Sequence, residues 1–213
     1  MRIRITFAKT DAMRFTGHLD LHHTWERTFR RARLPLAYSQ GFNPHPHINL
    51  ACALPLGFTS ENEIVDVWLD ERRLVADIEA ALIPALPPGL KISRIEEIES
   101  GEPTLQTELL ASKYLITFLE EIQELEKRVQ EILSADTLPR QRREKDYDLR
   151  PLILDLQLHP SDSQGRQRLL VCLSAREAAT GRPEEVIAVL GASPNATRVH
   201  RIGLIFRSKN EVV

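Results

Sequence analysis

Cysteine and long apolar runs are scarce in this sequence of 213 residues. The two cysteines, Cys52 and Cys172, both lie in aliphatic runs, which excludes a disulfide framework and a cysteine-ligated metal or iron–sulfur centre. No apolar run approaches the ~20 residues of a membrane span, and the N-terminus alternates charged and apolar residues instead of forming a signal-peptide core. We therefore expect a cytoplasmic protein that makes no contact with a membrane.

The composition is that of a globular protein, with 42% hydrophobic and 27% charged residues. The net charge of −2 conceals a segregation, because residues 1–60 carry +5, residues 61–131 carry −10 and residues 132–213 carry +3. A polyanion responds to the local field of a surface, so the two basic segments are compatible with nucleic-acid binding.

The first half of the chain predicts a compact α+β domain. Period-2 alternation predicts a strand at 3–7, and an apolar stripe at helical spacing predicts a helix over 18–33. Strands at 48–54 and 64–69, a helix over 71–83 and a strand at 90–95 follow. This order, βαββαβ, predicts a ferredoxin-like antiparallel sheet with two helices on one face.

The second half repeats that order. Strands are expected at 114–118, 153–158, 168–173 and 199–206, with helices over 121–133 and 183–190. We therefore expect two tandem ferredoxin-like domains, at 1–99 and 113–213, joined by a linker over 100–112. Two such sheets side by side would create a cleft between the domains.

Residues 38–47 combine two aromatic rings, two amides, two histidines, a glycine and two prolines. That mixture predicts a shaped surface loop, because glycine permits positive φ and each proline holds the preceding residue extended. Rigid loops that present hydrogen-bonding groups commonly form binding or catalytic sites. A structural turn with incidental histidines is the alternative.

A second basic loop, at 140–150, occupies the corresponding place in the second half. Arginine supplies forked donors to phosphate and tyrosine a stacking plane, so this loop and the basic face of the first helix could hold RNA. Both could also be ordinary solvated surface. The residues predicted to contact nucleic acid are Arg27, Arg30, Arg31, Tyr38, Gln40, Phe42, Asn43, His45, Arg140, Arg142, Arg143, Lys145, Tyr147 and Arg150.

The histidines allow a catalytic alternative. His18, His45 or His47, with Tyr38 or an arginine on the phosphate, could cleave RNA by acid–base chemistry, because imidazole titrates near neutral pH. The histidine spacing matches no standard metal site, and neither Ser39 nor either cysteine lies in a nucleophile motif. We therefore expect no metal and no bound cofactor.

Five segments resemble one known protein family. They are residues 14–21 (RFTGHLDL), 30–46 (RRARLPLAYSQGFNPHP), 54–57 (LPLG), 145–153 (KDYDLRPLI) and 182–186 (RPEEV). Together they resemble the uncharacterised radical SAM-linked protein family. The resemblance implies a partner that is a radical SAM enzyme, often with a cobalamin-binding domain, and it supplies no catalytic residues. Gly17 departs from the serine expected before His18, which removes a hydroxyl cap.

The resemblance implies an accessory role, because two isolated cysteines cannot supply the three-cysteine cluster motif of a radical SAM enzyme. By fold analogy, tandem ferredoxin-like domains also resemble the repeat-processing endoribonucleases of CRISPR systems, which makes RNA the first ligand to test. The leading hypothesis is a noncatalytic protein that presents RNA or another substrate to its partner. A metal-independent ribonuclease, and a structural protein that docks through the acidic 61–131 segment, are the alternatives.

Overall fold

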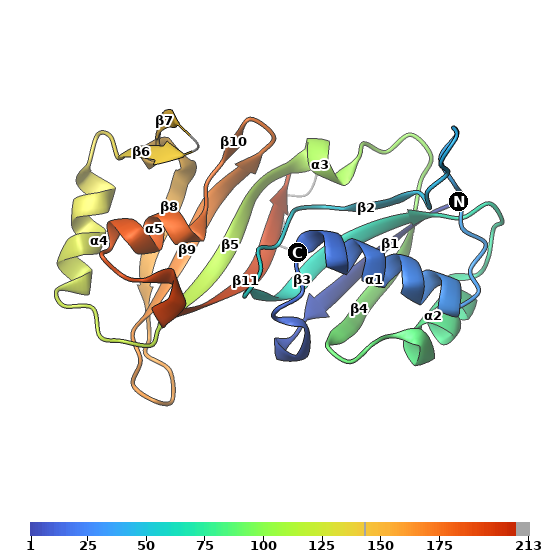
Figure 1. Ribbon diagram of the computed structural model, residues 1–213, viewed down its shortest axis with the longest axis horizontal. Coiled ribbons are helices and arrows are strands. Elements are labelled where there is room, and N and C mark those ends of the chain that lie inside the picture. Colours follow the sequence, from blue (N-terminus) through green and yellow to red (C-terminus); the bar gives the residue numbers. More distant parts are fainter. Residues whose placement is uncertain (143, 208–213) are drawn as a thin grey trace. The chain divides into compact units, whose positions relative to one another are not determined.

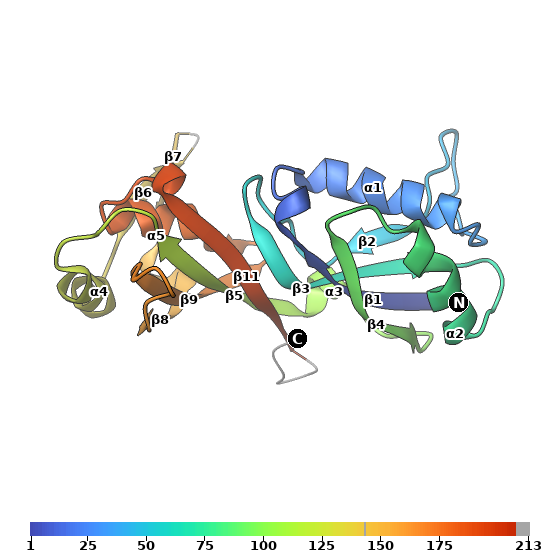
Figure 2. The ribbon, with the colours of Figure 1, turned by 90° about the horizontal axis from the view of Figure 1, so that it is seen from below.

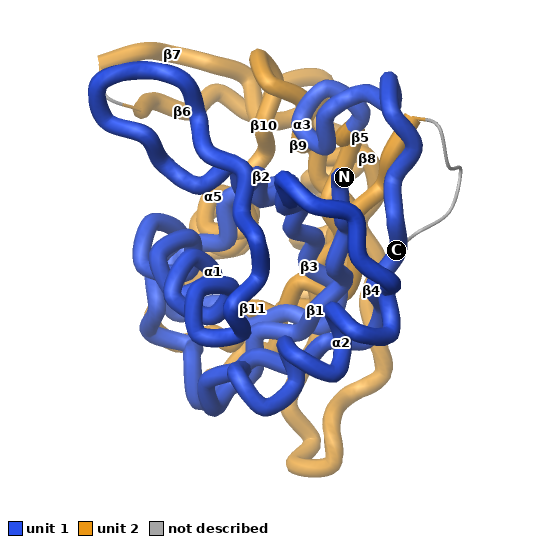
Figure 3. Tube along the Cα trace, turned by 90° about the vertical axis from the view of Figure 1, so that its right-hand side faces the viewer, with its two compact units in different colours: residues 1–108 blue, residues 109–213 orange. Residues whose placement is uncertain are grey.

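The computed structural model describes residues 1–142 and 144–207, which form two compact units divided between residues 108 and 109 (Figures 1 and 3). Each unit is mixed α+β, with an antiparallel sheet and helices. No helix in the described part of the chain combines the length and apolar character needed to cross a bilayer.

The first unit has four strands in the order β2-β3-β1-β4, and every neighbouring pair is antiparallel. Its elements along the chain are β1 (Arg2–Lys9), α1 (His18–Arg31), β2 (Ile48–Leu50), β3 (Thr59–Trp68), α2 (Val75–Leu82), β4 (Leu90–Ile98) and α3 (Leu105–Glu108), with short 3-10 helices at Asp11–Met13 and Ile83–Ala85.

One face of this sheet carries both longer helices. Alternation along β1 directs Ile3, Ile5 and Phe7 to this face, where they form one buried cluster with Trp25 of α1 and Ile78 of α2. Figure 1 shows α1 lying across the strands. The core of the first unit therefore lies between the helices and the sheet.

The other face of the β1–β3 pair carries a buried ion cluster. Asp66 is fully buried, and its carboxylate accepts hydrogen bonds from Nε of Arg2 and Nε of Arg4, each at 2.9 Å. Arg2 also donates to the carbonyls of Glu102 and Pro103, at 2.8 and 2.9 Å. One carboxylate thus compensates two guanidinium groups and helps to tie residues 102–103 to the first strand.

The second unit has four main strands in the order β8-β9-β5-β11, again antiparallel throughout. Its elements are β5 (Leu109–Phe118), α4 (Leu125–Ser134), β6 (Pro139–Arg142), β7 (Lys145–Asp148), β8 (Ile153–His159), β9 (Arg168–Arg176), β10 (Ala179–Thr180), α5 (Pro183–Val189) and β11 (Thr197–Phe206), with 3-10 helices at Arg150–Leu152 and Pro194–Ala196. β6 and β7 form a separate hairpin, and β10 pairs with the end of β9.

Several predicted boundaries are wrong, for identifiable reasons. The strand predicted at 48–54 pairs with β3 only over Ile48–Leu50. Residues 59–63, polar and therefore not predicted, belong to β3 because they pair with the end of β1. Residues 109–112, expected in the linker, begin β5. The loop predicted at 140–150 contains the β6–β7 hairpin.

Three helices are also shorter than predicted. α2 begins at Val75 instead of Glu71, and α4 begins at Leu125, after Glu124 adopts a left-handed φ of 54°. The first helix ends at Arg31, because Arg33 turns to a left-handed φ of 54° and the Leu34 N–H bonds the Phe29 carbonyl at 3.2 Å. That hydrogen bond is typical of a C-terminal cap with a left-handed residue.

The ion cluster generates a stability prediction. Replacing Asp66 by asparagine keeps the shape of the side chain but leaves two largely buried guanidinium groups without a counter-charge. We expect the free energy of unfolding, measured in urea, to fall by about 3 kcal/mol. Asp70→Asn, at an exposed carboxylate, is the control and should leave stability nearly unchanged. Equal effects from the two variants would contradict this account of the cluster.

Candidate nucleic-acid interface

The exposed face of α1 is a stripe of cations. Trp25 is buried and packs edge-on against Phe7 and stacked on Phe29, with ring centroids 4.8 and 5.1 Å apart. This packing fixes the rotation of α1, so its arginines at 27, 30 and 31 face solvent. No hydrogen bond or ion pair from these three guanidinium groups occurs within the described ranges. They are available to an anionic ligand.

The start of α1 is held by a buried lysine. Lys9 is fully buried, and its Nζ donates to the carbonyls of Arg14, Thr16 and Phe58, at 3.3, 2.8 and 3.0 Å. Gly17 precedes the helix in extended conformation without a side-chain cap, as its lack of a hydroxyl predicts. The lysine therefore holds the segment that leads into α1, where no side-chain cap holds the start of the helix.

Residues 38–47 form a projecting loop just after α1. Its base is joined to the sheet, since Ala37 N–H bonds the Trp68 carbonyl and His47 N–H bonds the Ala37 carbonyl, each at 2.8 Å. Farther out, Tyr38 and Pro46 form an isolated antiparallel β-bridge, and the Ser39 N–H donates to the His45 carbonyl at 2.9 Å. Figure 2 shows this loop standing out from the unit near the end of α1.

Two aromatic rings of this loop face solvent. Tyr38 is 44% exposed, and Phe42 is fully exposed beside Gly41, whose φ of +138° belongs to the region that favours glycine. The other predicted contact residues of the loop, Gln40, Asn43 and His45, are exposed as well. Exposed aromatic rings at the tip of a braced loop suit stacking against unpaired bases.

His47 has a structural role at the base of the loop. Its ring stacks on Trp68 with centroids 3.8 Å apart and an interplanar angle of 7°, and the Arg2 guanidinium lies 5.1 Å from the centroid of the same indole. This predicted catalytic candidate therefore braces the loop.

The catalytic candidates lie on two segments: Tyr38, His45 and His47 belong to the projecting loop, whereas His18 is the first residue of α1. His18 begins α1 and His45 lies in the loop beyond its end, and a helix of 14 residues is about 20 Å long. An acid–base pair must reach the same reacting group, within hydrogen-bond distance of the protons it transfers. Among the described residues, no group of three or more His, Cys, Asp or Glu side chains is placed to hold a metal ion.

The predicted contact residues of the second unit divide into two kinds. Arg140 pairs with Glu185 at 3.0 Å, and Arg150 donates to the carbonyls of Ile153 and Leu133, each at 3.1 Å, so both arginines hold the hairpin in place. Arg143 lies outside the described residues. Arg142, Lys145 and Tyr147 instead line a pocket.

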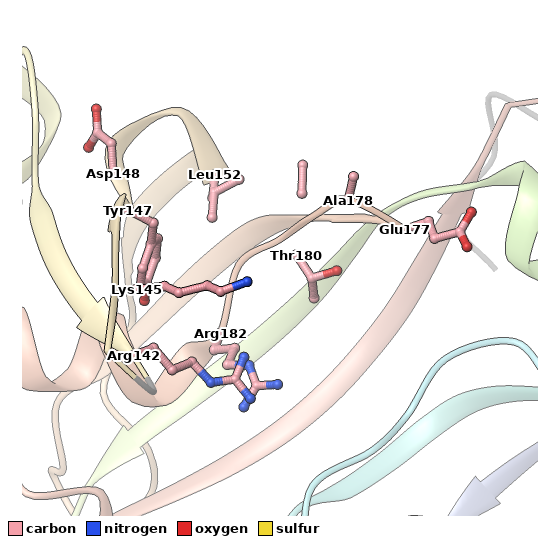
Figure 4. A pocket seen from close by; sticks show the side chains of 10 residues that line it. Arg142, Lys145, Tyr147, Asp148, Leu152, Glu177, Ala178, Thr180 and Arg182 are labelled. Atoms are coloured by element: carbon pink, nitrogen blue, oxygen red, sulfur yellow. The ribbon is translucent and has the colours of Figure 1, made fainter.

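This pocket lies entirely within the second unit and has a volume of about 760 Å³ (Figure 4). The strand β10 and the residue before α5 complete its wall, adding Thr180 and Arg182. Sequence analysis missed both residues, because residues 182–186 predict only the start of a helix. Their position depends on β10, which is only two residues long and pairs with the end of β9.

Tyr147 is the titratable group that the pocket perturbs. Burial raises the pKa of its phenol, and the nearby Glu185 carboxylate raises it further, while Arg140, Arg142 and Arg182 act in the opposite direction. The net effect is a raised pKa, so the phenol remains protonated and able to donate a hydrogen bond at neutral pH.

The two arginines of β11 differ in exposure. Arg198 is exposed on β11, whereas Arg201 on the same strand is fully buried. The last strand therefore adds no continuous basic surface within the described residues.

Solved structures resemble this chain at low sequence identity. One, from a Cbf5-Nop10-Gar1 complex, aligns with a TM-score of 0.50 and 8% identity over 95% of this chain and 48% of that chain. The chain thus spans about half the length of the protein it matches, and the likeness shows a mixed α+β fold. A structure described as a dyp-type peroxidase protein from Shewanella oneidensis aligns with a TM-score of 0.22 and 10% identity, over 92% of this chain and 88% of that chain, and carries no argument. No curated protein matches the chain.

The cause of the Tyr147 shift can be tested directly. Glu185→Gln should lower the pKa of Tyr147, because the substitution removes the carboxylate that opposes the phenolate and frees Arg140 to stabilise it. Ultraviolet difference spectroscopy against Tyr147→Phe would isolate the titration of this phenol. Glu177→Gln, which changes a carboxylate that also lines the pocket, should leave that pKa nearly unchanged. A pKa that rises or stays constant in Glu185→Gln would refute the assignment.

A protein-family model matches residues 2–183, which is most of the chain. The match includes the α1 stripe, the projecting loop and all of the described residues that line the pocket. The chain therefore belongs to the bacterial family described as uncharacterized protein conserved in bacteria (DUF2344).

Proposed function

We propose that this protein binds RNA through its first unit, as an accessory protein of a radical SAM enzyme. The observation that carries the proposal is the α1 stripe, where Arg27, Arg30 and Arg31 are exposed without an acidic partner among the described residues. Most other arginines of this unit are paired or bonded, such as Arg2 and Arg4 with Asp66. Unpaired cations on one helix face suit a row of phosphates.

The projecting loop supports single-stranded RNA as the ligand. Sequence-tolerant binding of a single strand combines cations that follow the backbone with aromatic rings on which bases stack. Tyr38 and Phe42 supply such rings within the same unit as the arginines. The exposed amides of Gln40 and Asn43 could hydrogen-bond to base edges, which are accessible in loops and at strand ends.

The radical SAM partner is supported by the motif resemblance alone. Cys172 is buried on β9, and Cys52 lies on the other unit, so the two thiols cannot provide a cluster-binding motif. In this proposal the partner performs the radical chemistry, and this chain holds the RNA on which the partner acts.

We also propose that each unit is a ferredoxin-like domain. In the first unit the strand order β2-β3-β1-β4 with helices after β1 and β3 fits the βαββαβ plan. The second unit fits it with β8-β9-β5-β11, provided that the β6–β7 hairpin and β10 are insertions.

The arginine stripe gives the main functional prediction. Replacing Arg27, Arg30 and Arg31 together by alanine should weaken binding of a single-stranded RNA. The slope of log affinity against log salt should also become shallower by about 2, because each phosphate contact to a single strand contributes ~0.7. Fluorescence anisotropy at several salt concentrations measures both quantities.

A triple variant of matched charge provides the control. Arg72, Arg73 and Arg94 belong to the same unit but pair with Glu97, Glu71 and Glu96, and their replacement by alanine should leave the salt slope nearly unchanged. If the two triple variants lost affinity equally, general charge would account for binding, and the α1 stripe would not be the site.

A further inference from the structure

The pocket of the second unit brings together three cations that form no ion pair with a carboxylate of the described residues. These cations are Arg142, Lys145 and Arg182. In Figure 4 the side chains of these three residues extend into the pocket. Arg142 and Arg182 both line the pocket with Tyr147, and both oppose the rise in the pKa of its phenol.

The two acidic residues that line the pocket, Asp148 and Glu177, do not neutralise these cations. Asp148 also lines the pocket, but its Oδ1 accepts hydrogen bonds from the N–H groups of Leu138 and Arg150, at 2.7 and 2.9 Å. Figure 4 shows its carboxylate directed away from the three cations, and Glu177 extending away from them on the opposite side. The interior of the pocket is therefore positively charged.

Apart from Thr180, the rest of the wall is apolar or aromatic. Leu152, Ala178 and Ala179 line the pocket together with the ring of Tyr147, whose protonated phenol is a hydrogen-bond donor. A volume of about 760 Å³ lies within the ~300–1,000 Å³ typical of small-molecule sites. The matching ligand has an anionic group for the cations and a planar or apolar group for this wall.

From this arrangement we infer that the pocket binds a nucleoside phosphate, with the phosphate among Arg142, Lys145 and Arg182 and the base or ribose against Tyr147 and Leu152. Guanidinium groups bind phosphate oxygens through forked donors, and a tyrosine ring provides a stacking plane for a base. The site goes beyond the proposed RNA surface, because all of its residues belong to the second unit. A free nucleotide and the 5′-phosphorylated end of an RNA share this chemistry.

The experiment uses the full chain and calorimetric titration with each of the four nucleoside 5′-monophosphates, the corresponding nucleosides and inorganic phosphate. At least one monophosphate should bind about tenfold or more tightly than both its nucleoside and inorganic phosphate, because only the monophosphate reaches the cations and the apolar wall together. Binding of none of the monophosphates, or equal binding of inorganic phosphate, would overturn the inference.

Variants then locate the site. Arg142→Ala and Arg182→Ala should each weaken the monophosphate about tenfold, which is the loss expected for one charge-assisted interaction. Arg198→Ala, an exposed arginine of the same unit outside the pocket, should change the affinity less than twofold, with circular dichroism reporting the fold of each variant. Equal losses in Arg198→Ala and the pocket variants would overturn the assignment to this pocket.

Two further experiments distinguish a free nucleotide from an RNA end, and this site from the RNA surface of the first unit. Competition by a 5′-phosphorylated oligonucleotide, but not by its 5′-hydroxyl form, would identify an RNA end, and no competition by either would identify a free nucleotide. The triple alanine variant at Arg27, Arg30 and Arg31 should retain monophosphate binding. Its loss of monophosphate affinity would contradict a separate site in the second unit, whereas loss of RNA affinity alone leaves this inference intact.

Discussion

Buried positive charge must be compensated, and in the first unit this constraint is met at Asp66. Its carboxylate bonds Arg2 and Arg4 across the β1–β3 pair, at a position where all three side chains are largely or fully buried. Leaving either guanidinium without a partner at that depth would cost several kcal/mol. Lys9 meets the same constraint at the other end of β1, through three main-chain carbonyls. These interactions fix the strand and the segment before α1, on which the position of the arginine stripe depends.

The cations of the chain therefore divide by environment. Arg2, Arg4 and Lys9 stabilise the first unit, and Arg140 and Arg150 hold the hairpin of the second. The arginines without such partners include those on the exposed face of α1 and those in the pocket beside Tyr147. An overall charge of −2 gives no indication of this division. Ligand binding is proposed only for cations without such partners, because a cation already bonded to a carboxylate or carbonyl has fewer donors and less uncompensated charge for a phosphate.

Sequence periodicity is sufficient to predict the order of the main strands and helices, because the alternation in β1 and the apolar stripe of α1 reflect burial directly. Boundaries that depend on pairing were not predictable. The polar residues 59–63 belong to β3 only through their partners on β1, and β10 exists only beside the end of β9. The division of the basic loop also depends on contacts distant in sequence. Composition groups Arg140 and Arg142 together, but only Arg140 pairs with Glu185.

The account of RNA binding depends most on the combination of the α1 stripe with the aromatic loop. Photocrosslinking of a single-stranded RNA to the full protein, with adducts mapped by mass spectrometry, tests it without altering the chain. Because Tyr38 and Phe42 are the exposed rings beside the stripe, we predict adducts within residues 38–45. Efficient crosslinking with no adduct in that loop would contradict the account.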